Sequence, residues 1–298
     1  MVKKLFYLFL LIIICSCEKA IPFDQELDSN KVVVNGIYFR DSVWKIHLSK
    51  SKSILDTSTS KNLENAIISI LDQNSNEIDT LQYFNNGFYY GSKSPNYGSY
   101  ELNIKSTLNE NTTSISTLPN PVPAIIIDTL SYINNGNNRL EISINFDDPI
   151  TDENYFEIGV YMKKRKMSIN TNSNGQTDTN YSIICKWMNL KSDDQNIEKT
   201  LDNNLIFDDK LFNGSNKTIS FDVRNKIKDF SNDPINELIT FDIYFINISY
   251  SLYHFHRSLK NYVNQSGDPF SQPTQVYSNI NNGIGVFAGS SPYKINLF

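Results

Sequence analysis

The residues of this chain that could carry acid–base chemistry are four adjacent pairs of carboxylates. General acid–base catalysis needs two carboxyl groups whose surroundings drive their pKa values apart, and adjacency along the chain does not provide this. Each pair adjoins a Pro, Asn or Ser turn signal, so we expect solvated loop tips, with a weak calcium site as the alternative. The pairs are Asp147-Asp148, Asp152-Glu153, Asp193-Asp194 and Asp208-Asp209.

Residue types that bind metals are few and poorly spaced. The segment from Asp72 begins like a calcium loop, but its sixth residue is Glu77 instead of Gly and its twelfth is Tyr83 instead of Glu, so we expect a hairpin turn. His254 and His256 are the only close pair among three His. On a helix, positions i and i+2 point to roughly opposite sides. We therefore predict no metal site and no cofactor.

Sequence motifs of the common catalytic classes do not occur in the chain. It contains no G-x-S-x-G, H-E-x-x-H, P-loop or dinucleotide-binding pattern. The 27 Lys+Arg against 32 Asp+Glu give a net charge of -5, which argues against nucleic acid as a partner because phosphate binding needs a basic surface. We predict a protein that is not an enzyme, and keep a hydrolase with an unrecognised site among the loop carboxylates as an alternative.

The N-terminus contains the one cysteine whose neighbours indicate a modification. Lys3 and Lys4 precede an apolar run over residues 5–14, which is shorter than the ~20 residues of a membrane-spanning helix and is typical of a secretory signal peptide. Ile14-Cys15-Ser16-Cys17 then resembles the acylation box of bacterial lipoproteins. We predict a signal peptide over residues 1–16 and lipid attachment at Cys17; an ordinary signal peptide is the alternative.

The predicted lipid attachment at Cys17 has consequences for the residues that follow it and for Cys185, the one cysteine that would remain unmodified. Two or more acyl chains hold a protein stably on a membrane, whereas one is marginal. Residues 17–30 are polar and irregular and are predicted to be a tether. Cys185 lies in the apolar stretch 181–187, so we expect a buried structural thiol.

Alternating and β-branched runs predict an all-β chain, mainly β with one short helix. About seven short strands within residues 31–118 indicate an immunoglobulin- or transthyretin-like β-sandwich. Three prolines in residues 119–124 indicate a linker. Residues 125–298 are predicted to form a second β-rich domain with a helix near 249–264. Of the 17 Tyr and 18 Phe, most are expected in the core, and an exposed aromatic platform is the alternative.

Two further segments of the second domain have compositions that indicate their structure. Residues 170–180 are rich in Asn, Ser and Thr, which favours a polar loop. The tail over residues 269–298 carries Pro and Gly throughout and contains Phe and Tyr. We predict that it packs on the body as an ordered meander.

The tail is also where the chain resembles a known family. Its residues Pro269-Phe270 and the run from Ser278 through Phe287 are similar to the C-terminal signature of a Bacteroidota lipoprotein family, the domain of unknown function 4249. Further matching segments are 31–36, 97–102 and 146–149. We expect the motif to be structural and to close the second domain. Its residues are Pro269, Phe270, Asn279, Gly283, Gly285 and Phe287.

The resemblance implies a location in the cell and a genomic context, and no established activity comes with it. Members are similar in being predicted outer-membrane lipoproteins, often encoded beside TonB-dependent receptors. The hypothesis is a non-enzymatic, lipid-anchored and surface-exposed accessory subunit of a TonB-dependent nutrient-uptake system. Its expected partners are the membrane, through the lipid anchor, a TonB-dependent receptor, and a glycan or peptide ligand. The alternative is a freestanding adhesin that binds glycans or proteins.

Overall fold

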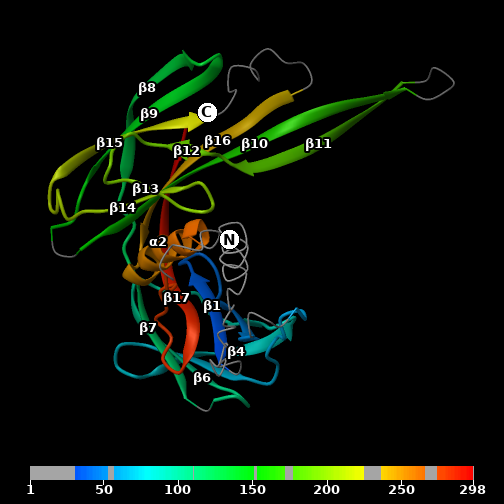
Figure 1. Cartoon of the computed structure of the whole chain (residues 1–298), viewed down its shortest axis with the longest axis vertical. Coiled ribbons are helices and arrows are strands. Elements are labelled where there is room, and N and C mark those ends of the chain that lie inside the picture. The colour runs from blue at the N-terminus through cyan, green and yellow to red at the C-terminus, as the bar shows by residue number, and fades with distance from the viewer. Residues whose placement is uncertain are drawn as a thin grey trace, which may run out of the picture.

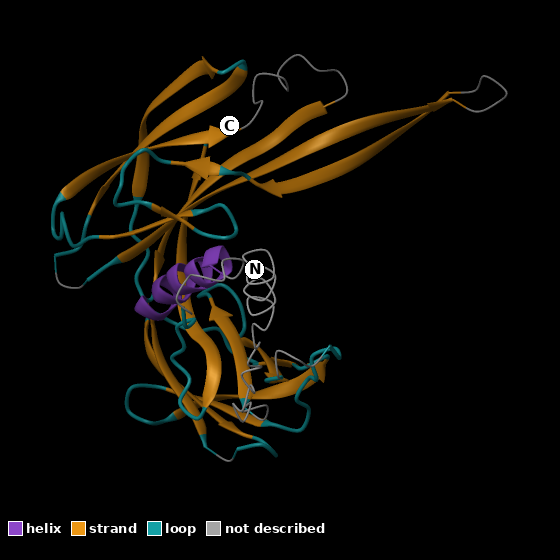
Figure 2. Ribbon diagram, viewed as in Figure 1, coloured by secondary structure: helices purple, strands orange, loops and turns teal. Residues whose placement is uncertain are grey.

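The computed structural model shows two β modules joined end to end, with one helix at their junction (Figures 1 and 2). It describes residues 31–52, 57–109, 111–150, 153–171, 177–224, 236–265 and 274–297. The signal peptide, Cys17, the tether, Pro269 and Phe270 lie outside the described residues. The prediction of an all-β chain is confirmed, since strands dominate and α2 is the one helix within those ranges.

The N-terminal module is a β-sandwich built from the first seven strands. Hydrogen-bonded neighbours follow the order β1-β2-β5-β4-β3-β6-β7, and the path folds back so that β7 lies beside β17 (Gly283–Asn296). Alternate side chains of each strand enter one core, which holds Val34, Trp44, Ile68 and Tyr89. The strands are β1 (Val32–Tyr38), β2 (Lys45–Lys50), β3 (Ile67–Leu71), β4 (Glu77–Asn85), β5 (Phe88–Tyr90), β6 (Gly98–Lys105) and β7 (Thr112–Leu118).

The C-terminal module packs two sheets around an aromatic core. One sheet has the order β12-β15-β9-β8, and the other contains β13-β14-β10-β16-β17. Phe146 of the first sheet and Phe156 of the second both contact Phe245, at ring-centroid distances of 4.6 and 5.0 Å. The strands are β8 (Ala124–Asn134), β9 (Asn137–Asp147), β10 (Tyr155–Thr171), β11 (Thr177–Trp187), β12 (Leu190–Lys191), β13 (Glu198–Lys199), β14 (Leu205–Asp208), β15 (Asn216–Arg224) and β16 (Asn236–Ile248).

The C-terminal strand β17 belongs to both modules. Its residues 283–289 pair parallel with β1, and its residues 290–296 pair antiparallel with β16. Phe287 is fully buried in the N-terminal core, with its ring 4.7 Å from that of Tyr38. The expectation that the tail motif closes the second domain is therefore wrong. The described residues of the motif complete the first sandwich. Residues 283–296 of the tail form a long strand instead of a meander, and residues 274–282 lead into it outside any named helix or strand.

The helix is confirmed as α2 (Tyr250–Gln265), one residue from the predicted bounds. Ser249 precedes it, and its Oγ accepts a hydrogen bond from the backbone N–H of Leu252, as an N-cap residue does. Leu252 and Tyr253 are buried against Ile246 and Val286, so the helix packs on β16 and β17 where the modules meet.

The longest strand, β10, forms with β11 a hairpin that projects beyond the body, at the upper right of Figure 1. Strand β10 runs to Thr171 and β11 starts at Thr177, so most of the polar loop expected over residues 170–180 is strand. We call residues 161–171 and 177–187 the arm.

Within the described residues, no helix is both long and apolar enough to cross a membrane.

The close approach of β17 to β1 predicts that Gly285 tolerates no side chain. Its φ is +117°, and a Cβ there would lie 1.9 Å from the carbonyl oxygen of Val34. Gly285→Ala should lower the free energy of unfolding by ~3 kcal/mol, because it adds backbone strain and a clash. Urea denaturation of the two proteins is the measurement.

The matched control is Gly136 in the β8–β9 turn. Its φ is +75°, but no atom lies within 4 Å of the position that a Cβ would take there. Gly136→Ala should therefore cost only about 1 kcal/mol, which is the strain of a left-handed backbone alone. Equal losses in the two variants would contradict the close contact between β17 and β1.

Candidate functional site

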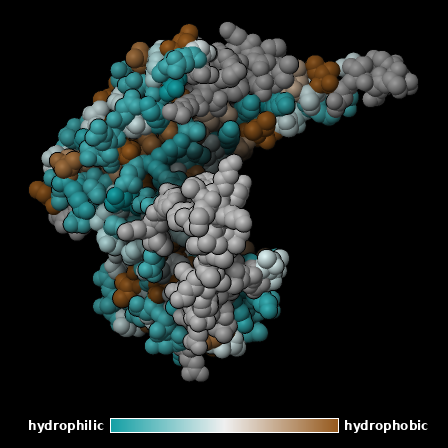
Figure 3. Space-filling model, viewed as in Figure 1, coloured by the Kyte–Doolittle hydropathy of each residue, from teal (hydrophilic) through white to brown (hydrophobic). Residues whose placement is uncertain are grey.

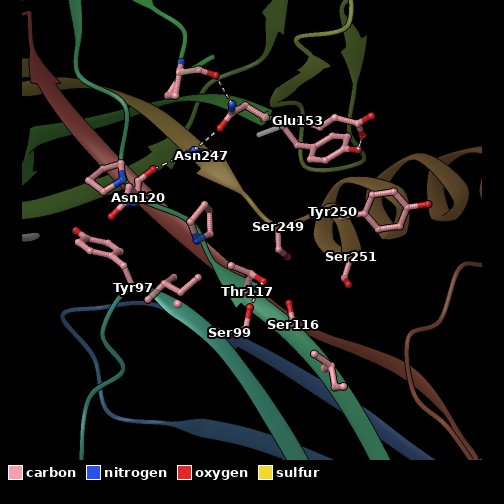
Figure 4. Close-up of a pocket in the computed structure, with 18 of the residues that line it drawn as sticks. Tyr97, Ser99, Ser116, Thr117, Asn120, Glu153, Asn247, Ser249, Tyr250 and Ser251 are labelled. Carbon is pink, nitrogen blue, oxygen red and sulfur yellow. Dashed lines mark hydrogen bonds between the residues drawn. The ribbon is translucent and has the colours of Figure 1, made fainter. Parts of the chain in front are cut away.

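A large hollow lies where the two modules meet. It has a volume of about 1070 Å³ and is shown in Figure 4. We call it the inter-module cleft. Its walls come from β6 and β7, residues 119–122, the segment before β10, the end of β16, the start of α2 and the tail before β17. The lining side chains include Tyr97, Ser99, Ser116, Thr117, Asn120, Glu153, Tyr155, Asn247, Ser251, Tyr250, Tyr277 and Asn279.

Asn247 fastens the connecting segment to the C-terminal module. It is almost fully buried, and its Nδ2 donates to the carbonyl oxygen of Asn120 at 2.9 Å and to Oδ1 of Asn154 at 3.2 Å (Figure 4). The backbone N–H of Asn154 in turn donates to Oδ2 of Asp209 at 2.7 Å. This chain of bonds holds residue 120 against the C-terminal module, and with it one wall of the cleft.

Tyrosine rings form one wall of the cleft. Tyr250, the first residue of α2, lies 5.6 Å from the ring of Tyr155 and 6.1 Å from that of Tyr277. The hydroxyl of Tyr155 donates to Oε2 of Glu153 at 2.8 Å. Burial, followed by this bond to Glu153, raises the pKa of Tyr155 well above its usual range, so the phenol stays neutral.

The N-terminal module contributes hydroxyl groups and one more tyrosine. Oγ of Ser99 and Oγ1 of Thr117 are 2.7 Å apart on the neighbouring strands β6 and β7 (Figure 4). Tyr97 is held by Arg40, whose Nη1 donates to the tyrosine hydroxyl at 3.2 Å and whose guanidinium lies 4.9 Å from the ring centre. This side of the cleft therefore presents neutral donors and acceptors.

Asn279 of the tail motif connects the cleft to β17. Its Nδ2 donates to the carbonyl oxygen of Phe287 at 2.7 Å and to Oγ of Ser251 at 3.0 Å, and its Oδ1 accepts from the N–H of Phe287 at 3.0 Å. The structure thus brings Asn279, Gly283, Gly285 and Phe287 together at the edge of the first sandwich. Their roles there are packing and hydrogen bonding.

The carboxylate pairs differ from the prediction of solvated loop tips in two cases. Asp193 is exposed, as expected, but Asp148 and Asp209 are buried. Oδ2 of Asp148 accepts from the N–H of Gly214 at 2.8 Å. Burial, with the nearby charge of Asp209, raises the pKa of Asp148. Asp148 and Asp209 accept hydrogen bonds from the loops before β15 and β10, respectively. Turn signals in the sequence do not show that these loops pack over the two carboxylates and bury them.

The remaining candidates give one correction and one agreement. Cys185 is exposed on the arm, so the prediction of a buried thiol is wrong. The segment from Asp72 is a hairpin turn, with Oδ1 of Asp72 accepting from the N–H groups of Asn74 and Asn76. No group of three or more His, Cys, Asp or Glu within the described residues could hold a metal ion.

Comparison with known proteins identifies the family. The model of the family described as Domain of unknown function (DUF4249) matches residues 18–296. The chain belongs to this family. No curated protein matches the sequence. A solved structure of the Enterococcus faecalis MSCRAMM ACE, described as binding its ligands by the collagen Hug model, is 11% identical. The match covers 88% of this chain and 98% of that one, but its TM-score of 0.16 carries no argument.

The cleft of this DUF4249 chain suits the binding of a neutral, polar molecule. Aromatic faces, hydroxyls and amides are present, and Glu153 is the one carboxylate among the described lining residues. His254 packs 4.1 Å from Tyr250, and burial, with the nearby Arg257, lowers its pKa, which keeps the imidazole neutral at neutral pH. Such groups recognise a ligand by stacking and hydrogen bonds. The sequence missed this cleft because its walls come from segments that lie far apart along the chain.

The buried Asp148 predicts a pH-dependent gain in stability when its charge is removed. Because its folded-state pKa is raised, the folded protein binds this proton more tightly than the unfolded chain, and stability falls as pH rises above about 4. At pH 7, Asp148→Asn should therefore raise the free energy of unfolding by about 1 kcal/mol. The gain should vanish as the pH falls below about 4.

Urea unfolding at pH 7 and pH 3.5 measures the effect, with Asp193→Asn as the control. Asp193 is exposed, so its variant should change stability by less than about 0.5 kcal/mol at either pH. A loss of stability for Asp148→Asn at pH 7 would show that the carboxylate has a favourable charged partner.

Proposed function

We propose that this DUF4249 chain is a non-enzymatic lipoprotein of the Bacteroidota outer membrane. In this proposal it serves as a surface-exposed accessory subunit of a TonB-dependent nutrient-uptake system and holds a polar ligand in the inter-module cleft. The observation that carries the proposal is the cleft itself: a large hollow walled by Tyr97, Tyr155, Tyr250 and Tyr277 and by neutral polar groups.

The N-terminal sequence supports the anchoring part of the proposal. Cleavage before Cys17 would leave 282 of the 298 residues and remove Lys3 and Lys4, which takes the net charge from -5 to -7. An acidic protein is not drawn to an anionic membrane by its charge. Acyl chains on Cys17 would supply the attachment at ~0.8 kcal/mol per buried CH₂.

The same tyrosines favour a second candidate, a freestanding adhesin that binds glycans or proteins at the cell surface. Tyr250 is exposed and presents its ring at the mouth of a cleft lined with hydroxyl and amide groups. An adhesin and an uptake subunit would use this cleft alike. They differ in whether a TonB-dependent receptor accompanies the protein, which the first experiment below addresses.

Attachment and partner are tested together in cells that carry a tagged chain. After a high-salt wash, the unchanged protein should remain with the outer membrane and, after solubilisation in detergent, should co-purify with a TonB-dependent receptor. Cys17→Ala should lose both properties, because the chain would lack its acyl chains. Cys185→Ala is the control, since it removes an exposed thiol that carries no lipid in this proposal.

Two outcomes would contradict the proposal in different ways. A Cys17→Ala protein that still sediments with washed envelopes would exclude the lipid anchor. Recovery of the anchored protein without any TonB-dependent receptor would exclude the uptake role and favour the adhesin.

The ligand site is tested with Tyr250→Ala on an array of soluble polysaccharides and peptides. The unchanged chain should bind at least one member, and Tyr250→Ala should bind it at least tenfold more weakly, which corresponds to ~1.4 kcal/mol. Tyr262→Ala is the matched control, because Tyr262 lies on the same helix, is 45% exposed against 52% for Tyr250, and does not line the cleft. Equal binding by both variants would exclude the cleft as the site.

A further inference from the structure

One face of the arm carries exposed apolar side chains, and basic residues lie on both faces, since Lys163 and Arg165 share the apolar face with Tyr181. The two strands of the arm pair without a register shift, from Tyr161 opposite Trp187 to Thr171 opposite Thr177. Side chains alternate along each strand, so the odd-numbered residues of both strands share a face. That face carries Ile169, Tyr181, Ile183 and Trp187, which are 56%, 63%, 59% and 45% exposed. Figure 3 shows apolar side chains at the arm surface.

The outer edge of the arm offers unpaired backbone groups. Within the described ranges, β11 pairs only with β10. The N–H of Met188 donates to the carbonyl oxygen of Val160. The backbone N–H and C=O groups of the even-numbered residues of β11 therefore point toward β10. The N–H groups of odd-numbered residues, such as Thr179, Tyr181 and Ile183, therefore point away from β10, where a further strand could pair.

The arm also has the opposite charge from the rest of the protein. Residues 161–187 contain five basic residues, four of them consecutive over 163–166 and the fifth Lys186, and one acidic residue, Asp178. Their net charge is +4 in a chain of net charge -5. Lysines often protect an edge strand from aggregation, but only Lys186 lies on the edge strand itself, so this role does not explain the other four.

At its base the apolar face of the arm continues into a second hollow of about 690 Å³. The ring of Trp187 lies 5.5 Å from that of Tyr244, and both line the hollow together with Leu201 and Leu252. Ile37 and Phe39 at the end of β1 close it from the N-terminal module. The hollow thus joins the arm to the first sandwich.

We propose that the arm is a docking edge for an acidic, extended segment of a partner protein, which adds to β11 as a strand. Tyr181 and Ile183 would pack its apolar side chains, and the basic residues of the arm would attract its carboxylates. A protein strand satisfies the free N–H and C=O groups of the edge, whereas lipid does not. This surface does not include the inter-module cleft, so the inference is independent of the ligand proposed there.

The test measures fluorescence anisotropy of a labelled decapeptide of alternating Glu and Val, mixed with the full-length chain in detergent. The acidic peptide should bind at least tenfold more tightly than its Lys–Val counterpart. Thr179→Pro should weaken binding at least tenfold, because it removes an outward N–H and leaves the bonds to β10 in place. Thr179→Val retains the N–H and should bind normally.

Further variants separate charge and packing from the integrity of the arm. Lys166→Glu with Lys186→Glu should also weaken binding at least tenfold, and so should Ile183→Asp, which keeps every backbone donor. Tyr250→Ala in the cleft should bind the peptide normally, so failure of the ligand proposal leaves this test intact. Circular dichroism confirms that each variant is folded.

Three outcomes would overturn the inference. The first is equal binding of the acidic and basic peptides, or full binding by Thr179→Pro. The second is binding to phosphatidylglycerol vesicles that Ile183→Asp abolishes, without peptide binding, which would assign the arm to a membrane surface. The third is self-association that Thr179→Pro abolishes, which would assign the edge to a second copy of this chain.

Discussion

The structure depends on one strand that is hydrogen-bonded into two modules at once. The first half of β17 pairs with β1 and its second half pairs with β16. The last strand of the chain therefore links the strands of one module to those of the other by backbone hydrogen bonds. Interfaces between domains usually allow relative motion. A continuous strand removes much of that freedom, because rotating one module relative to the other would break the hydrogen bonds of β17 to β1 or to β16. The absence of a side chain at Gly285 lets β17 come this close to β1.

The inter-module cleft is a consequence of that arrangement. Asn279 bonds both backbone groups of Phe287, and Asn247 bonds the segment that enters the second module at Asn120. Side-chain amides that bond several backbone groups define a geometry more sharply than apolar packing does. Tyr250 of α2 and the hydroxyls of β6 and β7 therefore face each other at a fixed separation before any ligand arrives, which reduces the ordering that binding would require.

Sequence patterns predicted what depends on local periodicity and missed what depends on distant partners. The strands of the first sandwich and helix α2 were recognised because their apolar residues recur at periods of two and about 3.6. Parallel pairing of β17 with β1 joins residues some 250 positions apart, and no local pattern encodes it. The arm was missed for another reason: it has no core to face, so residues 170–180 contain the polar residues of a loop. The burial of Asp148 follows from loop packing, which turn signals do not specify.

The two proposed surfaces have different chemistry, although the cleft and the base of the arm both lie at the junction of the modules. Tyr250 on α2 lines the cleft among neutral groups, whereas Leu252 on the same helix lines the apolar hollow at the base of the arm. The described lining residues of the cleft include no Lys or Arg, so the carboxylates of an acidic strand gain nothing there. The arm has no enclosed set of hydroxyls and amides, so a neutral polar ligand gains little on it. In the two proposals, the cleft would recognise a ligand and the arm would recognise a partner, through different groups.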